Sequence, residues 1–389
     1  MRRWPVLAVL LVVGCGSAPA GTARPSASPS ADASGAAREA SQAAAEPLFA
    51  VLEPGGDFAL MRNDVVAIVR VDGTARAKAS FKPRRLPQVG EGLTLPQPEA
   101  RTAGGRVFFA DGAGMIRSLG SDGAQSEVTR FPLTGPQQAL SFAVSPDGGR
   151  LVGAVLDFPP ATTSIGQAAA SPPTGAYSLE LFNAVAGAPA VSAQRKAWPA
   201  AVRLPGDLLS VVGWSASSAM ATVDTSPVAQ YKTEGRQMFG HVAEIDGSGK
   251  AGLMVGGSDC QPWTVLPDET VLCDRGGHQD VSIRSRGGQV LFQLRSAPDL
   301  QYVNLTLSPD GSKVAYVEAL SRRVFVIGQD NRPTELPASF QPQGWLTSTT
   351  LVGLTGQGSG HMALVRLGNP RRVIDLGFKG FFVGALPAS

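Results

Sequence analysis

Short runs in which apolar and polar residues alternate, separated by turn residues, dominate the chain after its first fifty residues. In the clearest example, residues 303–307 and 313–317 flank a turn that contains proline and glycine. Proline presets φ at the first corner of a turn, and glycine accepts the positive φ that other residues resist. Two such runs predict a β-hairpin, which returns almost unchanged at residues 144–152. The two turns are Ser308, Pro309, Asp310 and Gly311, and Ser145, Pro146, Asp147 and Gly148.

Degenerate copies of this hairpin recur along the chain. Seven can be aligned on the turn, at residues 52–60, 103–109, 144–152, 214–221, 265–272, 303–317 and 345–352. Most copies begin about 40 to 50 residues apart, the period of four-stranded propeller blades. The interval between the third and fourth copies is near 70 residues, and we expect an inserted loop at 157–176 there.

Turn chemistry agrees with this repeat. Six Asp-Gly dipeptides begin at Asp72, Asp111, Asp122, Asp147, Asp246 and Asp310, and the chain has 46 Gly and 30 Pro. Asp-Gly between alternating runs is a strong hairpin signal. No long 3.6-residue periodicity follows residue 48. These features predict an all-β protein built from antiparallel hairpins.

The pattern apolar/Trp-Ser-Pro-Asp-Gly-x-x-Leu-Ala-Tyr resembles the repeat of bacterial TolB-like and WD40-like β-propellers. Two copies carry the complete Ser-Pro-Asp-Gly, and the fourth keeps the Trp-Ser start at Trp214. The resemblance covers residues 47–386 and implies a single propeller of four-stranded antiparallel blades, with seven favoured and six or eight left open. It implies no particular activity, because propellers have many unrelated functions.

A propeller must close its ring, and the two ends of the chain usually share a blade. Residues 380–386 form an apolar run after the seventh copy is complete. We expect this run to pair with strands near residues 48–60.

The N-terminus has the features of an export signal. Arg2 and Arg3 precede a ten-residue apolar run that is too short to span a bilayer. The run ends in Val12-Val13-Gly14-Cys15, which resembles the bacterial lipobox. We therefore expect residues 1–15 to be a lipoprotein signal peptide with Cys15 as the lipidated residue. The alternative is an ordinary secretory signal that contains a cysteine.

The next segment, residues 16–46, consists mainly of Ala, Ser, Gly, Pro and Thr. This composition cannot bury enough apolar surface to offset the entropy of ordering, so it predicts a disordered tether before a propeller at 47–389. The expected location is the extracytoplasmic face of the cell membrane, with the lipid as anchor.

Cys260 and Cys273 remain after Cys15 is assigned to lipid. In an exported, oxidising setting they are candidates for a disulfide. They are symmetric about Leu266-Pro267, so a tight turn there would place them opposite each other on neighbouring strands. The alternative is a pair of reduced, buried thiols.

Other residue types give little sign of chemistry. The formal net charge is +3 without a dense basic run, so we expect no nucleic-acid partner. His241, His278 and His361 fall in separate repeats and are interpreted as loop or strand residues rather than metal ligands. Asp147 and Asp310 are explained by the repeat turn. No catalytic, cofactor or metal residue is predicted.

Two function classes remain open. The first is a non-catalytic binding or scaffold module for an envelope protein, peptide or glycan, and we expect it to be a monomer. The second is a propeller enzyme of lyase, glycosidase or quinone-dependent dehydrogenase type, with its site at the central channel. Three or more convergent ionisable groups in a ligand-sized pocket would favour the enzyme. Trp214, Trp263 and Trp345 are interpreted as inter-blade packing, with a binding face as the alternative. We expect any functional surface to lie in the parts that differ between the copies, which are the 157–176 insertion, the 225–240 loop and the cystine hairpin.

Overall fold

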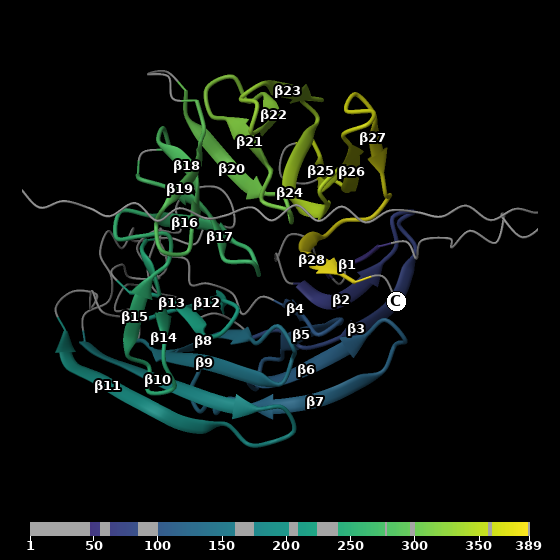
Figure 1. Ribbon diagram of the computed structural model, residues 1–389. Coiled ribbons are helices and arrows are strands. Elements are labelled where there is room, and N and C mark those ends of the chain that lie inside the picture. The colour runs from purple at the N-terminus through teal and green to yellow at the C-terminus, as the bar shows by residue number, and fades with distance from the viewer. Residues whose placement is uncertain are drawn as a thin grey trace, which may run out of the picture. The chain divides into compact units, whose positions relative to one another are not determined.

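Seven four-stranded antiparallel sheets stand side by side around a common centre in the computed structural model (Figure 1). The structure describes residues 47–54, 63–84, 100–159, 175–201, 209–223, 240–276, 278–295, 300–356 and 360–387. The predicted signal peptide, Cys15, the tether, and most of the 157–176 and 225–240 segments lie outside these residues. Within the described part, the predicted all-β propeller is confirmed, and it has seven blades. These residues contain no helix long and apolar enough to cross a membrane.

The blades are numbered along the chain, each from its innermost to its outermost strand. Blade 1 is β28 (Phe381–Leu386), β1 (Leu48–Pro54), β2 (Asn63–Val69) and β3 (Ala75–Ser80). Blade 2 is β4 (Arg101–Ala103), β5 (Arg106–Ala110), β6 (Met115–Gly120) and β7 (Gln125–Arg130). Blade 3 is β8 (Gln138–Val144), β9 (Arg150–Asp157), β10 (Gly175–Val185) and β11 (Val191–Ala201). Blade 4 is β12 (Val211–Trp214), β13 (Ala219–Thr222), β14 (Val242–Ile245) and β15 (Ala251–Met254).

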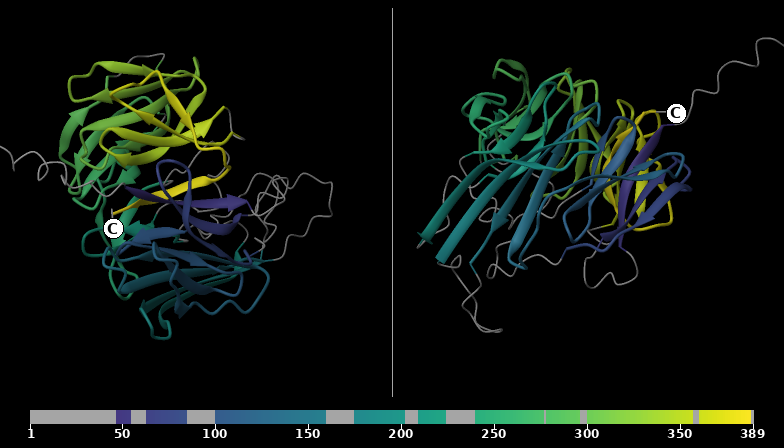
Figure 2. Two further views of the ribbon diagram at one scale, coloured as in Figure 1. Left: turned by 90° about the vertical axis from the view of Figure 1, so that its right-hand side faces the viewer. Right: turned by 90° about the horizontal axis from the view of Figure 1, so that it is seen from below.

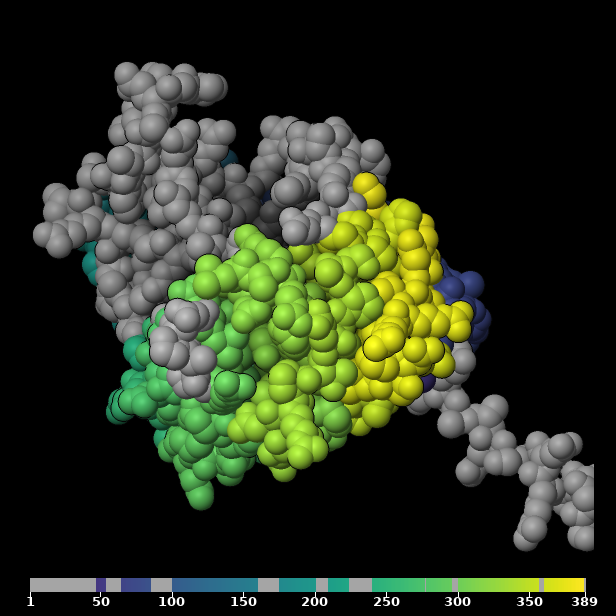
Figure 3. Space-filling view, turned by 90° about the horizontal axis from the view of Figure 1, so that it is seen from above, coloured from purple at the N-terminus to yellow at the C-terminus, as the bar shows by residue number. Residues whose placement is uncertain are grey.

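The other three blades follow the same plan. Blade 5 is β16 (Gln261–Val265), β17 (Thr270–Asp274), β18 (Val281–Ser285) and β19 (Val290–Gln293). Blade 6 is β20 (Tyr302–Leu307), β21 (Lys313–Glu318), β22 (Val324–Gly328) and β23 (Pro333–Leu336). Blade 7 is β24 (Phe340–Thr347), β25 (Thr350–Thr355), β26 (Met362–Arg366) and β27 (Val373–Asp375). Blades 5 to 7, green to yellow, pack side by side in Figure 3.

The hydrophobic core is divided among the contacts between blades. Each of the seven blade-to-blade junctions has its own cluster of buried side chains. Successive side chains of a strand point to opposite faces of the sheet, so an inner strand supplies one neighbouring blade and then the other. A single blade therefore cannot bury its apolar faces alone, and the ring is the stable unit.

Ring closure occurs as the sequence predicts. β28 pairs antiparallel with β1, with Leu386 opposite Leu48 and Phe381 opposite Leu52 (Figure 2). The alignment of the first hairpin copy, residues 52–60, needs correction. In that blade the copy joins the second and third strands, whereas the other six copies join the first and second. The reason is that the innermost strand of blade 1 comes from the other end of the chain.

The long interval between the third and fourth copies also has a second cause. The expected insertion contributes, but β10 and β11 are 11 residues each and form the longest hairpin.

Throughout the ring, turns from first to second and from third to fourth strands lie at one side, which we call the turn face. Connections from second to third strands and between blades lie at the other side, the loop face. All six Asp-Gly dipeptides lie between consecutive paired strands.

Candidate functional site

Exposed apolar side chains gather on blades 3, 4 and 5. Six large hydrophobic side chains are exposed among the described residues, and five of them belong to these blades. A group of exposed apolar residues on a soluble domain commonly marks an interaction site. The five are Val185, Val191, Leu253, Val290 and Leu291, and the sixth is Leu320 on the loop face of blade 6.

A pocket of about 440 Å³ opens between blades 3 and 4 at the turn face. Its walls include Leu151 and Val152 of β9 and Ala219 of β13, and Val185 and Val191 also line it. We call this space the Trp214 pocket, after the indole that closes its inner side. On its outer side, the Asn183 side-chain amide of β10 donates to Gly247 O at 2.6 Å and so ties the two blades together.

A cation and an aromatic ring meet in this pocket. The Arg150 guanidinium lies over the Trp214 ring, 5.3 Å from its centroid, in a cation–π contact. The indole Nε1–H of Trp214 is buried and has no hydrogen-bond acceptor among the described residues. The pocket thus combines apolar walls with one exposed positive charge.

A second pocket, of about 390 Å³, lies between blades 4 and 5 on the same face. It is lined by the exposed Leu253 and Leu291 and by Asp268, Glu269 and Arg286. Arg286 is held from two sides, by Glu269 Oε1 at 2.8 Å and by Glu244 Oε2. The hydrogen bond from Arg286 to Glu244 raises the pKa of the guanidinium. This pocket therefore contains three ionisable groups, and its arginine acts as an ionic clamp between the two blades.

The seven innermost strands carry two ionisable side chains, Arg101 and Tyr302, and Tyr302 is completely buried. Within the described residues, no three His, Cys, Asp or Glu side chains come close enough together to hold a metal ion. The convergent groups therefore lie at the pocket between blades 4 and 5 rather than on the strands around the centre.

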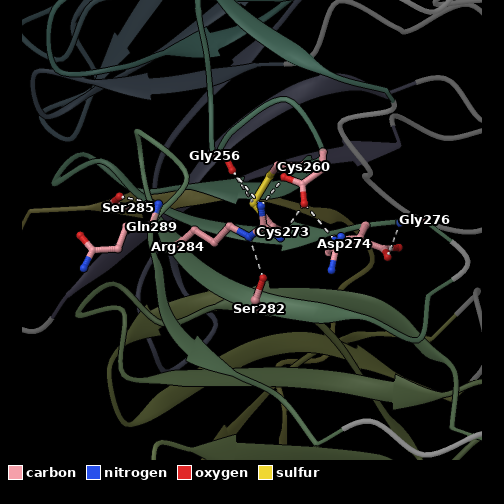
Figure 4. Close-up of a disulfide and its surroundings, with 11 residues drawn as sticks. Gly256, Cys260, Cys273, Asp274, Gly276, Ser282, Arg284, Ser285 and Gln289 are labelled. Carbon is pink, nitrogen blue, oxygen red and sulfur yellow. Dashed lines mark hydrogen bonds and ion pairs between the residues drawn. A yellow bond between two sulfur atoms is a disulfide. The ribbon is translucent and has the colours of Figure 1, made fainter.

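The cysteines lie at the junction of blades 4 and 5. Cys260 precedes β16, Cys273 is on β17, and their sulfurs are 1.92 Å apart in a disulfide (Figure 4). Both residues are fully buried. The expected register is wrong, because Cys273 faces Pro262 rather than Cys260. The turn spans Leu266 to Thr270, with its last corner at a positive φ, so it is centred later than the Leu266-Pro267 symmetry implies.

A buried arginine fixes the loop that carries Cys260. Arg284 donates to Ser282 Oγ, to Gly256 O at 3.2 Å and to Asp259 Oδ1 at 2.6 Å (Figure 4). The hydrogen bond from Arg284 lowers the pKa of the Asp259 carboxyl. The loop between blades 4 and 5 is thus attached by a disulfide on one side and by a charge-assisted bond on the other.

One imidazole on the loop face has a buried acid as its partner. Asp274 is 1% exposed and accepts hydrogen bonds from the Gly276 N–H and from His278 Nδ1, at 2.9 and 2.8 Å. The hydrogen bond to Asp274 raises the pKa of His278, although partial burial opposes the change. The Trp263 ring meets the imidazole edge-on, with centroids 5.9 Å apart.

This pair predicts a pH-dependent stability. Because the folded-state pKa of His278 is raised, its contribution is complete below the unfolded value of about 6.5 and is lost as the pH rises through the raised value. His278→Asn is the matched variant, since Asn tolerates the φ of 61° at this position. We expect the difference in unfolding free energy between wild type and variant to shrink from pH 6 to pH 9 in urea titrations. A constant difference would contradict the assignment.

The acids of the repeat turn serve that turn. Ser145 Oγ–H and the Gly149 N–H both donate to Asp147 Oδ1, and these bonds lower the pKa of the Asp147 carboxyl. Asp310 accepts from Ser308 Oγ–H at 2.6 Å in the same way. The Gly148 and Gly311 N–H groups close the two turns, with φ of 76° and 67°. Pro146 and Pro309 occupy the preceding corner of each turn.

The Trp214 pocket contains residues that the sequence did not single out. Arg150 was assigned only to a repeat hairpin, and Asn183 carried no motif. The sequence did contain one signal. After its tryptophan the fourth copy (214–221) has only Ser, Ala and Met, whereas the seventh copy (345–352) has two leucines. Trp345 and Trp263 are buried between blades, as expected, whereas Trp214 lines a pocket.

Comparison with known proteins identifies the architecture. No protein-family model and no curated protein sequence matches this chain. An acylaminoacyl peptidase from Pyrococcus horikoshii is similar over 84% of this chain at 11% identity and a TM-score of 0.51, and the match spans 52% of that peptidase. Virginiamycin B lyase from Staphylococcus aureus is 15% identical over 75% of this chain and 85% of its own, with a TM-score of 0.39.

A functionally unknown protein from Desulfotomaculum acetoxidans is 11% identical over 88% of this chain and 99% of its own, with a TM-score of 0.44. Of these three, only the peptidase exceeds a TM-score of 0.5, and at 11% identity that likeness shows a shared fold and nothing about activity.

Proposed function

We propose that this chain is a binding module that recognises a partner protein or peptide through the turn face of blades 3 to 5. The observation that carries the proposal is that, of the six large apolar side chains exposed in the described part of the chain, five lie on these three blades. Four of the five also line the two pockets of that face. Apolar contact area beside pockets is the arrangement that anchors protein–protein interfaces.

The location of the module follows from the N-terminal pattern. The proposal places the propeller on the extracytoplasmic side of a membrane, as a monomer, with Cys15 lipidated and residues 16–46 as its tether. It also assigns the repeats to the TolB-like and WD40-like group, on the strength of the two Ser-Pro-Asp-Gly turns.

Photo-crosslinking of the full chain in its native cells tests both parts. We expect one envelope protein to crosslink to the wild type and the adduct to fall at least tenfold in a Val185→Lys/Val191→Lys variant. Leu320→Lys is the control, because Leu320 is 75% exposed but lies outside the proposed surface. Equal crosslinking of all three proteins would refute the surface. Cys15→Ser should move the protein from the membrane fraction to the soluble fraction, and retention in the membrane would refute the anchor.

The enzyme alternative is favoured by two arrangements: the three ionisable groups of the pocket between blades 4 and 5, and the His278–Asp274 pair. A buried carboxylate that orients an imidazole is common in general acid–base sites. Asp274 ends β17 and His278 lies on the connection to β18, at the loop face, whereas the apolar surface lies at the turn face. Neither arrangement includes Val185 or Val191, so substitutions at these two residues test only the first function.

A further inference from the structure

The junction between blades 3 and 4 can be compared, position by position, with the junction between blades 6 and 7. Blade 3 and blade 6 carry the two complete Ser-Pro-Asp-Gly turns, and the innermost strand of the blade after each contains a tryptophan, Trp214 or Trp345. Each tryptophan ends or nearly ends an innermost strand, β12 or β24. The junction between blades 6 and 7 therefore serves as an internal reference for the junction between blades 3 and 4.

At the reference junction the tryptophan is buried and its indole N–H has a hydrogen-bond acceptor. Trp345 is 4% exposed, and its Nε1–H donates to Thr306 O of the preceding blade at 3.1 Å. The residue paired with it across the hairpin is Leu351, which is completely buried. Leu351 and Val326 belong to the core cluster that fills this junction.

At the junction of blades 3 and 4 the same positions carry smaller or polar residues. Ala219 pairs with Trp214, where the reference has Leu351. Asn183 of β10 occupies the position that Val326 of β22 has in the reference blade. Asn183 lies two residues before the partner of Arg150, and Val326 lies two residues before the partner of Lys313. A core leucine and a core valine are thus replaced by alanine and asparagine. The result is the Trp214 pocket, and the Trp214 indole N–H is left without an acceptor.

At the exposed edge of this junction the residues are more apolar than in the reference blade. Val185 and Val191 are 60% and 67% exposed, where the reference blade has Gly328 and Thr334. An empty core position surrounded by exposed apolar residues is the reverse of what stability alone favours. This combination is explained if a side chain from another molecule completes the junction.

The charged residues at the Trp214 pocket indicate which ligand group would lie next to the bound side chain. Arg150 is exposed beside the pocket, and the carboxyl of Asp147, which it attracts, already accepts two hydrogen bonds from its own turn. Asp246, the other charged residue of the lining, accepts three hydrogen bonds at Oδ1 from its own turn. Arg150 is the one cationic residue among those that line the pocket, and its exposed guanidinium can pair with a ligand carboxylate.

We propose that the Trp214 pocket receives an aromatic or branched apolar side chain from a partner's peptide segment, and that Arg150 pairs with a carboxylate next to that side chain. This rests on the proposed function as a peptide- or protein-binding module, and it names the chemistry recognised at that surface.

The test uses three blocked peptides and the full chain. N-acetylated, C-amidated Gly-Phe-Asp-Gly is compared with Gly-Phe-Lys-Gly and Gly-Ala-Asp-Gly by isothermal titration calorimetry. We expect the Phe-Asp peptide to bind at least tenfold more tightly than either of the others. Equal affinities, or no saturable binding of any peptide, would overturn the proposal.

Two variants locate the binding. Ala219→Leu restores the residue of the reference junction, so it should fill the pocket, keep or raise the melting temperature, and weaken binding of the Phe-Asp peptide at least tenfold. Arg150→Gln should lower the affinity for the Phe-Asp peptide to that for the Phe-Lys peptide. If either folded variant binds the Phe-Asp peptide as the wild type does, the assignment is wrong. Crosslinking that depends on Val185 and Val191 could persist in that case, so the two proposals fail separately.

Discussion

A chain that ends at Gly377 is expected to lose its cooperative thermal unfolding transition. The truncation removes β28, the innermost strand of blade 1, which pairs with β1 and packs against β24 and β4. Phe382 and Leu386 are 6% and 4% exposed, and they belong to the clusters on the two sides of the blade. Removing one large core side chain costs about 2 to 5 kcal/mol, and the total stability of a domain is about 5 to 15 kcal/mol. Loss of the whole strand is therefore comparable with the entire stability.

Differential scanning calorimetry measures this effect. Phe382→Ala is the graded control, because it keeps the strand and its backbone bonds and should lower the unfolding free energy by about 3 to 5 kcal/mol. Addition of a synthetic peptide covering residues 378–389 should restore a cooperative transition to the truncated chain, and a scrambled peptide should not. An unchanged melting curve after truncation would show that β28 does not close the ring.

Replacing both buried cysteines with alanine should lower the unfolding free energy by about 3 kcal/mol, from the entropy of closing a loop of this length. The disulfide joins residues 13 positions apart and belongs to the cluster at the junction of blades 4 and 5. Among the described residues, that cluster has six buried members, fewer than those at the other junctions. Within this part of the chain, the link therefore supports the junction with the smallest core.

Urea titrations with and without dithiothreitol test this. The reductant should destabilise the wild type to the level of the Cys260→Ala/Cys273→Ala variant and leave that variant unchanged. Gly256 offers an independent probe, because it has a φ of 78° and an added Cβ would lie 2.5 Å from the Cys260 sulfur. Gly256→Ala should destabilise the oxidised protein by more than the loss of the disulfide does. Equal stability of wild type and double variant in the absence of reductant would refute the role of the link.

The repeat made the architecture predictable from sequence. A Ser-Pro-Asp-Gly turn is specified by residues within a few positions of each other, through the Asp147 and Ser145 bonds and the positive φ of Gly148. Spacing then sets the number of blades, and an apolar run after the last repeat indicates the closing strand. The cysteine pair was also predictable from sequence, because Cys260 and Cys273 lie on either side of one expected hairpin turn.

The local unit and its period depend on neighbouring residues, and the closing strand is the apolar run left after the last repeat, so all three can be predicted from the sequence. What lies between the units depends on tertiary packing. The late turn at Glu269 shifted the fifth hairpin, although the alternation of its residues fits either register. Arg150 and Trp214 belong to different blades, and no pattern along the chain relates them. Whether an inter-blade position is filled, as at Leu351, or open, as at Ala219, depends on which side chains meet across two separately folded sheets. Packing complementarity of that kind is a property of three dimensions, and it is where the proposed binding site lies.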